Sequence, residues 1–286
     1  MPRSSAPPAS ASPLPDPAPA GAMPDGAGDA DVSPRQQEIV QRVREQGFVT
    51  IETLARMFDV SPQTVRRDII RLDEAGLIQR FHGGAGLKET TTRLVYSQKR
   101  AASPDGKKRI ARACAALIPH GSSVCLDVGT TVEAVAQALL EHRRMHVITT
   151  SVGAAGILAG SQVGDVVVTG GLMRGADGSL VGEAALASLN SFRMDTAVIG
   201  CSGFDDVDGA VMDFDLLKVA TKKAMAAQSR RVILVADATK FTRSALVRVM
   251  DFAAVSALVT DAPPPDHLAQ RIAEAGCRLL VAAQDD

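Results

Sequence analysis

From residue 107 onward the chain alternates between short apolar runs and helical segments, and this alternation limits the fold more than any other feature. Seven runs of four or five residues occupy positions 124–127, 147–150, 166–169, 197–200, 232–236, 257–260 and 279–282. Segments with helical patterning separate several of them, at 132–140, 184–189 and 216–228. Short strands that are apolar throughout are typical of a mostly parallel sheet covered by helices on both faces. Residues 107–286 are therefore predicted to form one Rossmann-like α/β domain.

The composition is that of a globular protein. Hydrophobic residues make up 46% of the 286 residues, charged residues 22%, and the net charge is -1. These values exclude a wholly disordered chain and a protein held to polyanions by bulk positive charge, so any contact with nucleic acid must be local. The four cysteines have no metal-ligand spacing, and the sequence holds no run of about 18 apolar residues and no apolar leader segment. We expect a cytoplasmic protein with no membrane association, no metal site and no cofactor.

Two segments are not expected to pack into a domain. Residues 1–33 contain eight of the fifteen prolines together with many Ala, Gly and Ser residues. Such a composition cannot bury a core, so this stretch is predicted to be a disordered tail. Residues 91–106 are assigned as a linker between an N-terminal domain at 34–90 and the effector-binding α/β domain at 107–286.

The N-terminal domain carries the pattern of a winged helix-turn-helix. The expected elements are helices at 34–46, 50–58 and 62–75, a strand at 77–81, a turn at 82–85 and a return strand. Ser61 followed by Pro62 is a strong helix start, because the serine oxygen caps a free amide and proline has no amide to satisfy. The short second helix, the capped third helix and the hairpin come in the order that this fold requires.

The third helix has the side chains that a major-groove reader needs. Val65, Ile69 and Leu72 fall on one apolar stripe, and polar and basic residues face the opposite way. Arginine can pair with guanine and glutamine with adenine in the major groove. The predicted DNA-binding residues of this helix and of the wing are Ser61, Gln63, Thr64, Arg66, Arg67, Arg71, Arg80 and His82. The alternative is an ordinary solvated helix face, and charge counting does not reject it, because residues 31–90 hold nine basic and nine acidic residues.

Three turns rich in glycine and hydroxyl groups follow successive predicted strands. They are Gly129-Thr130-Thr131, Thr149-Thr150-Ser151 and Thr169-Gly170-Gly171, and Arg174 comes shortly after the last. The carboxyl ends of parallel strands meet at one edge of a sheet, and the free amides of the helix after the first turn favour an anion. A concave anion site is therefore predicted at this edge. The alternative for the first turn is a helix cap without a ligand.

Two segments resemble the DeoR family of bacterial transcriptional repressors. They are Val60-Ser61-Pro62-Gln63-Thr64-Val65-Arg66-Arg67-Asp68 and Leu77-Ile78-Gln79-Arg80-Phe81-His82-Gly83-Gly84-Ala85. In that family the first segment is the recognition helix and the second is the wing, and the likeness covers nearly everything after residue 34. The resemblance implies a regulator, expected to be a repressor, that binds double-stranded operator DNA and controls genes of carbohydrate or glycerol metabolism.

The resemblance also implies the nature of the effector-binding domain. This domain of the DeoR family is similar to sugar-phosphate isomerases of the ribose-5-phosphate isomerase type, and its pocket holds a phosphorylated sugar or polyol. The matching pocket positions are Asp127, Gly129, Thr130, Thr131, Gly171, Lys222, Asp237 and Lys240, and the turns add Thr150, Ser151 and Arg174. Segments 177–184, 213–215 and 260–265 are most similar to family members that sense glycerol 3-phosphate, which is the expected effector.

Three residues depart from the family pattern. Thr150 stands where Asn is common, Lys218 where close relatives commonly have Glu, and Gly106 where Glu is usual. A change from a carboxylate to lysine reverses the local charge, which bears on which phosphorylated ligand fits.

Other functions share parts of this pattern. A sugar-phosphate isomerase needs a base with a tuned pKa near the substrate carbon, and Asp127 or Asp237 would have to serve. The predicted winged helix and the lack of another acid–base pair weigh against an enzyme, so no catalytic residue is predicted. An activator with the same fold is a further alternative, since the sign of regulation depends on promoter geometry. Symmetric proteins suit paired half-sites, so a homo-oligomer is expected.

Overall fold

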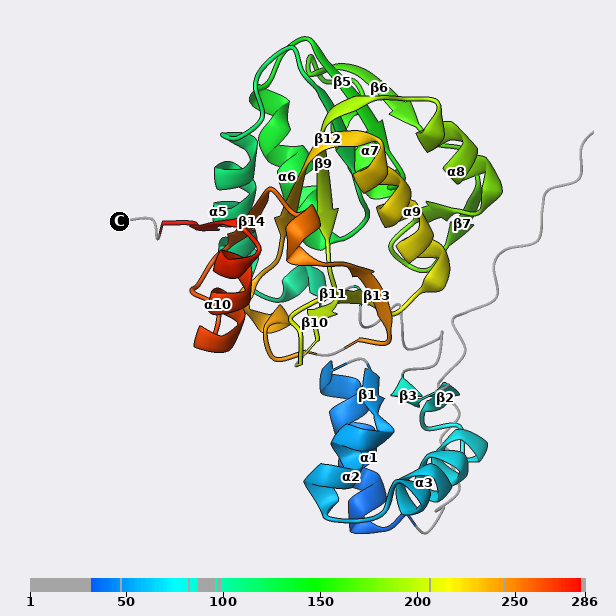
Figure 1. The fold of residues 1–286 in the computed structure, drawn as a ribbon. Helices are drawn as coiled ribbons and strands as arrows, with labels where there is room; N and C mark the ends of the chain where they lie inside the picture. The colour runs from blue at the N-terminus through cyan, green and yellow to red at the C-terminus, as the bar shows by residue number, and fades with distance from the viewer. Residues whose placement is uncertain are drawn as a thin grey trace, which may run out of the picture. The chain divides into compact units, whose positions relative to one another are not determined.

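The computed structural model describes residues 32–46, 48–81, 83–86, 96, 99–205, 207–243 and 245–283 (Figure 1). Apart from Val32 and Ser33, the predicted N-terminal tail lies outside the described residues, as does His82 of the predicted wing. None of the described helices is long and apolar enough to cross a membrane.

Three helices and a small sheet form the N-terminal domain. The elements are α1 (Pro34–Gln46), β1 (Phe48–Thr50), α2 (Ile51–Phe58), α3 (Pro62–Glu74), β2 (Gln79–Phe81) and β3 (Gly84–Gly86). Thr50 and Ser61 begin α2 and α3, because their hydroxyl oxygens accept hydrogen bonds from backbone amides of the first turn at 3.1 and 3.2 Å. The core contains apolar residues of all three helices, among them Ile39, Val43, Leu54, Val65, Ile69 and Leu72. The predicted order of three helices followed by a wing is confirmed.

The wing differs from the prediction in two details. Its sheet has three antiparallel strands in the order β1-β3-β2, and the sequence does not predict β1, because three residues are too few to show alternation. Gly84, predicted to lie in the turn, begins β3 and pairs with Thr50. A Cβ atom at Gly84 would lie 2.4 Å from the carbonyl oxygen of Val49, so the close approach of the two strands requires glycine here.

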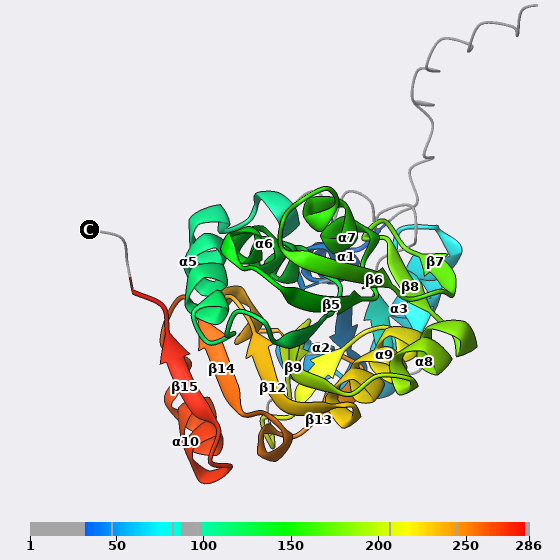
Figure 2. The ribbon, with the colours of Figure 1, turned by 90° about the horizontal axis from the view of Figure 1, so that it is seen from above.

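A seven-stranded sheet forms the centre of the C-terminal domain (Figure 2). In spatial order its strands are β15 (Arg278–Val281), β14 (Ala257–Thr260), β12 (Ser229–Val235), β9 (Met194–Gly200), β4 (Ser123–Leu126), β5 (Met145–Thr149) and β6 (Gly164–Val168). All neighbouring strands are parallel. Each of the seven predicted strands overlaps one of these, so the predicted parallel α/β architecture is confirmed.

Helices cover both faces of this sheet. They are α5 (Pro104–Ala115), α6 (Thr130–Ala138), α7 (Val152–Leu158), α8 (Glu183–Asn190), α9 (Leu216–Ala227) and α10 (Asp266–Glu274). Leu126 and Val198 share a core with residues of α5, α6 and α7. Cys125 and Ile199, their neighbours along the same strands, share a second core with residues of α8, α9 and α10. Successive residues of one strand thus enter two separate cores, which explains why these strands are apolar throughout.

Several short elements complete the domain, and of these only the 3-10 turn at Leu139–Glu141 overlaps a predicted element, the helix at 132–140. They are β7 (Leu172–Arg174), β8 (Ser179–Val181), β10 (Gly203–Phe204), β11 (Val211–Asp213), β13 (Val247–Met250) and single 3-10 turns at Leu139–Glu141, Ala238–Lys240 and Phe252–Ala254. β7 pairs with β8, and β10, β11 and β13 form a separate antiparallel sheet. The helix α5 begins at Pro104, so the predicted linker at 91–106 includes the first residues of this helix.

Candidate functional site

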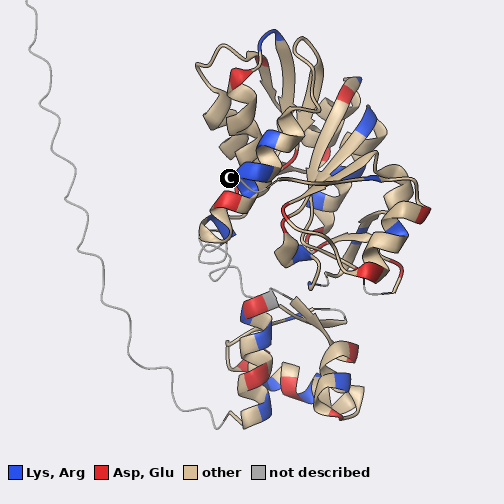
Figure 3. Ribbon diagram, turned by 90° about the vertical axis from the view of Figure 1, so that its left-hand side faces the viewer, with Lys and Arg blue, Asp and Glu red and all other residues tan. Residues whose placement is uncertain are grey.

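The helix α3 presents basic side chains on the face opposite its buried stripe. Val65, Ile69 and Leu72 are buried, whereas Arg66 and Arg67 are exposed. The other described residues of the predicted DNA surface are Ser61, Gln63, Arg71 and Arg80, which are exposed, and Thr64, which is half-buried. Basic and acidic residues both occur on the helices of this domain (Figure 3). This arrangement suits a helix that reads base edges by local contacts rather than by bulk charge.

A buried carboxylate fixes α3 against α1. Asp68 accepts hydrogen bonds from Arg35 Nε at 2.7 Å and from Gln36 Nε2 at 2.9 Å. Asp68 is buried although its neighbour Arg67 is exposed. Asp68 therefore sets the orientation of α3 against α1, and the exposed side chain of Arg67 is accessible to DNA.

The carboxyl edge of the central sheet contains buried polar atoms without partners. Asp127 follows β4, Thr150 follows β5 and Thr169 follows β6, and all three residues are buried. Asp127 Oδ1, Thr150 Oγ1 and Thr169 Oγ1 have no hydrogen-bond partner among the described residues. Buried polar atoms are rarely left unpaired, so these atoms suit the hydroxyl groups of a small polar ligand or bound water.

Three other predicted residues of this edge have roles in the fold itself. Ser151 Oγ caps α7 by accepting a hydrogen bond from a backbone amide of that helix at 3.1 Å. Gly171 has a φ of 118°, and a Cβ atom there would lie 2.5 Å from a backbone carbonyl oxygen of β8. Arg174 pairs with Asp215 at 3.8 Å. All three residues lie near this edge. The side chains of Ser151 and Arg174 are already bonded within the protein, and Gly171 is needed for a close backbone approach.

The turn after β4 presents the amino end of α6. Gly129, which has no side chain, is the N-cap residue and has a φ of 127°. Thr130 and Thr131 form the first turn, and Thr130 is half-buried. The first amides of a helix have no partner within the helix and carry a partial positive charge, so this end favours an anion.

Lys222 on α9 lies in a buried ion triad. Its Nζ contacts Asp127 Oδ2, lies 3.3 Å from Asp213 Oδ2 and donates to the carbonyl oxygen of Gly200 at 2.9 Å. Burial alone would lower the pKa of Lys222, but the two carboxylates outweigh it and hold the pKa above its usual value. Lys222, which is expected among the pocket residues, is therefore charged, and protein carboxylates compensate its charge.

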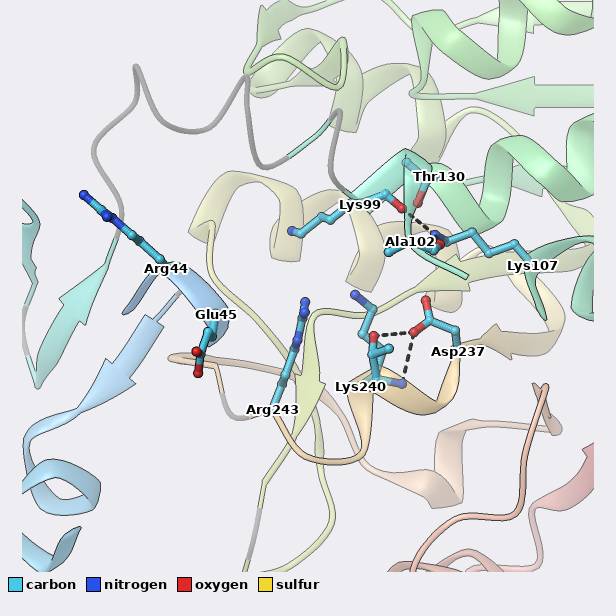
Figure 4. A pocket seen from close by; sticks show the side chains of 10 residues that line it. Arg44, Glu45, Lys99, Ala102, Lys107, Thr130, Asp237, Lys240 and Arg243 are labelled. Carbon is cyan, nitrogen blue, oxygen red and sulfur yellow. Dashed lines mark hydrogen bonds between the residues drawn. The ribbon is translucent and has the colours of Figure 1, made fainter. Parts of the chain in front are cut away.

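Within residues 99–283, four cations other than Lys222 lie beside the amino end of α6. Lys99, Lys107, Lys240 and Arg243 line one pocket together with Thr130 and Asp237 (Figure 4). Lys107 donates hydrogen bonds to the carbonyl oxygens of Lys99 and Ala102. Within the described part of the chain, none of these four cations forms an ion pair. We refer to Lys99, Lys107, Lys240 and Arg243 as the cation cluster.

The charges of the cation cluster repel one another. Burial, together with repulsion from Lys240, lowers the pKa of Lys99 to about 8. Burial also lowers the pKa of Lys107 and the pKa of Lys240, although Asp237 opposes the change in both. An anion bound among these groups would relieve the repulsion, so the cluster is chemically suited to a phosphate or another small anion.

Lys218, which the sequence analysis singled out, is also paired within the protein. Its Nζ lies 2.5 Å from Asp177 Oδ2 in the turn between β7 and β8, and both side chains are largely buried. The charge that this residue adds is thus balanced by Asp177. The other oxygen of that carboxylate, Asp177 Oδ1, is buried and has no partner in the described residues.

Comparison with known proteins identifies the family. The DeoR-like helix-turn-helix domain matches residues 35–91, and the DeoR C-terminal sensor domain matches residues 102–262. The chain belongs to the DeoR family. This DeoR-family protein is a transcriptional repressor with a helix-turn-helix for DNA and a sensor domain for a small-molecule effector.

Curated relatives cover most of this DeoR-family chain. The glycerol-3-phosphate regulon repressor of Escherichia coli (strain K12) is 41% identical over 236 residues, which are 82% of this chain and 93% of that protein. The repressor of the same name from Haemophilus influenzae is 40% identical over 230 residues, 80% of this chain and 89% of that protein. The HTH-type transcriptional repressor CsqR of Escherichia coli (strain K12) is 38% identical over 253 residues, 88% of this chain and 97% of that protein. All three are named as repressors, which supports a non-enzymatic regulator over the isomerase alternative.

Solved structures show a weaker likeness. Ribose 5-phosphate isomerase A from Methanocaldococcus jannaschii aligns with a TM-score of 0.36 and 16% identity, over 49% of this chain and 55% of that chain. The architecture of the sensor domain therefore rests on its own parallel sheet and on the family match.

Sequence reasoning on this DeoR-family chain missed three members of the cation cluster. Lys99 stands next to Arg100, and Lys107 begins a short basic run that continues to residue 109. Arg243 has no adjacent basic residue, and lysines and arginines in all of these settings are usually solvated. Lys240 was the only member with a sequence signal, because it follows a predicted strand by a few residues. Only the tertiary fold brings the four together.

Proposed function

We propose that this repressor controls genes of carbohydrate or glycerol metabolism and releases operator DNA when its sensor domain binds a phosphorylated sugar or polyol. Glycerol 3-phosphate is the first candidate, because two of the similar proteins are named for it. The observation that carries the proposal is a cluster of cations beside the amino end of α6 that form no ion pair within the described residues. Both features favour a phosphate group.

The site has one set of residues for the phosphate group of such a ligand and another set for its hydroxyl groups. We assign the phosphate to the amides at Gly129, Thr130 and Thr131 and to the ammonium group of Lys240. The unpartnered atoms of Asp127 and Thr150 would then hold the hydroxyl groups of the ligand. Lys222 would act indirectly, by keeping the carboxylate of Asp127 in place.

Binding of glycerol 3-phosphate is expected to weaken above pH 8. The lowered pKa of Lys99, about 8, means that the cluster loses positive charge as the pH rises through this value. The phosphate stays a dianion in this range, since its second pKa is about 6. If binding requires the protonated lysine, affinity falls about tenfold between pH 7 and pH 9. Isothermal titration calorimetry across this range measures the change, and a constant affinity would contradict the assignment of the phosphate to this cluster.

The DNA-reading face is tested by Arg67→Ala. Arg67 is exposed and lies opposite the buried stripe of α3, so its removal should leave the melting temperature unchanged. Loss of a base contact costs about 1–3 kcal/mol, or roughly 5- to 150-fold in Kd. Fluorescence anisotropy with DNA from upstream of the protein's own gene measures this loss. Arg56→Ala, which removes an exposed arginine from α2, is the matched control, and equal affinities for the two variants would refute the role of Arg67.

We also propose that the repressor acts as a homo-oligomer. Helix-turn-helix proteins commonly place two recognition helices on two half-sites of the operator, and a symmetric pair of chains supplies both. Sedimentation velocity on the full chain tests this directly, and a monomer that binds a single half-site with full affinity would overturn it.

A further inference from the structure

One member of the cation cluster comes from the segment between the two matched domains. The helix-turn-helix match ends at residue 91 and the sensor-domain match begins at residue 102, so Lys99 lies in the stretch that neither covers. Its side chain nevertheless lines the same pocket as Thr130 and Lys240 (Figure 4). A ligand in this pocket would therefore touch both the sensor domain and the chain that leads to the DNA-binding domain.

The backbone around Lys99 is fastened to the sensor domain. Lys107 is 5% exposed, and its Nζ donates hydrogen bonds to the carbonyl oxygens of Lys99 and Ala102. These bonds hold residues 99–102 against α5. The ammonium group of Lys99 itself has no ion-pair partner among the described residues, so it is available to an anion.

A second connection links this segment to the turn that carries Lys240. Asp261 accepts a hydrogen bond from Ser103 Oγ at 3.2 Å and, through its other oxygen, from the backbone amide of Ala238 at 2.8 Å. A Cβ atom at Gly106 would lie 2.1 Å from Asp261 Oδ2 and 2.4 Å from Ser103 Oγ. The absence of a side chain at Gly106 thus allows Asp261 to join the start of α5 to the turn that carries Lys240.

We propose that Lys99 is a ligand of the effector's phosphate group and the residue through which effector binding reaches the DNA-binding domain. A phosphate held by the amino end of α6, Lys240 and Lys99 fixes the segment at 99–103, and with it the start of the connection to the winged helix. This inference rests on the proposed function, because it takes the pocket to be the phosphate site. An effector changes DNA affinity only if it binds the two states of the protein differently, and Lys99 supplies such a difference.

Lys99→Gln separates this role from a simple contribution to affinity. The variant retains Lys240 and the amino end of α6, so it is expected to bind glycerol 3-phosphate about tenfold more weakly and still to be saturable. At saturating glycerol 3-phosphate, the wild type is expected to lose at least about tenfold in DNA affinity. The variant is expected to lose less than about threefold under the same condition. Lys99→Arg keeps the charge and is expected to restore release.

The controls address folding and nonspecific charge effects. Lys99→Gln removes one of several repelling cations, so its melting temperature without ligand should equal or exceed that of the wild type. Lys108→Gln removes an exposed lysine of α5, whose Nζ lies 3.5 Å from Asp105 Oδ1, and should behave as the wild type.

The outcomes distinguish this inference from the proposed function. If saturated Lys99→Gln releases DNA as fully as the wild type does, the coupling role is overturned and the phosphate-sensing function stands. If no member of a panel of sugar and polyol phosphates that includes glycerol 3-phosphate binds the wild type, both are overturned. Weakened binding, lost release at saturation and rescue by arginine together support the inference.

Discussion

Replacing Lys222 with alanine is expected to lower the free energy of unfolding by about 3–5 kcal/mol. The substitution leaves Asp127 and Asp213 buried without the ammonium group that both of them contact. Uncompensated buried charge is far more costly than the loss of an exposed ion pair, which is worth about 1 kcal/mol or less. Urea denaturation followed by circular dichroism measures the change as a lower midpoint.

The adjacent lysine provides a matched control. Lys223 is exposed on the same helix, and Lys223→Ala should unfold at the wild-type midpoint. If Lys222→Ala is as stable as Lys223→Ala, the ion triad does not stabilise the sensor domain. Because of this expected loss of stability, Lys222 is a poor position at which to test phosphate binding.

Lys240→Ala is expected to weaken binding of glycerol 3-phosphate by roughly 10- to 100-fold without affecting DNA binding. A hydrogen bond to a charged group contributes about 1.5–3 kcal/mol, and this lysine offers one to the phosphate. Lys240 makes no ion pair within the described residues, so the substitution strands no buried carboxylate partner. Isothermal titration calorimetry gives the affinity, and fluorescence anisotropy gives the DNA binding of the ligand-free variant.

Lys223→Ala again serves as the control for a general loss of positive charge on the domain. Wild-type affinity of Lys240→Ala for glycerol 3-phosphate would move the phosphate away from the cation cluster. Loss of DNA binding without ligand would show instead that Lys240 acts on the DNA-binding state itself.

The strands of the sensor domain are predictable from sequence because each is a local apolar run. Leu126 and Cys125 face different cores, so no polar residue interrupts the run that contains them. The spatial order of the strands cannot be predicted in the same way. β4 pairs on one side with β5, the next strand of this sheet along the chain, and on the other side with β9, which comes much later. No short window of sequence indicates a partner as distant as β9.

The chemistry of the site is less predictable than its location. The turns at Gly129 and Thr150 can be predicted at strand ends, because glycine and hydroxyl residues after a strand have local causes. The pairing of Lys222 with Asp127 cannot be predicted from local sequence, since the two residues are 95 positions apart. Lys99 gives no signal in the sequence, because a lysine in a linker has the same appearance whether it is solvated or lines a pocket.

The central claim is that a phosphorylated effector in the sensor domain releases the repressor from DNA. The most direct measurement is a fluorescence anisotropy titration of the full chain with DNA from upstream of its own gene, repeated with glycerol 3-phosphate, glycerol, inorganic phosphate and a panel of other sugar phosphates. At saturation, glycerol 3-phosphate or another phosphorylated member of the panel is expected to lower DNA affinity by about tenfold or more. Glycerol should have no effect. Release by glycerol alone, or DNA affinity that no phosphorylated compound changes, would contradict release by a phosphorylated effector.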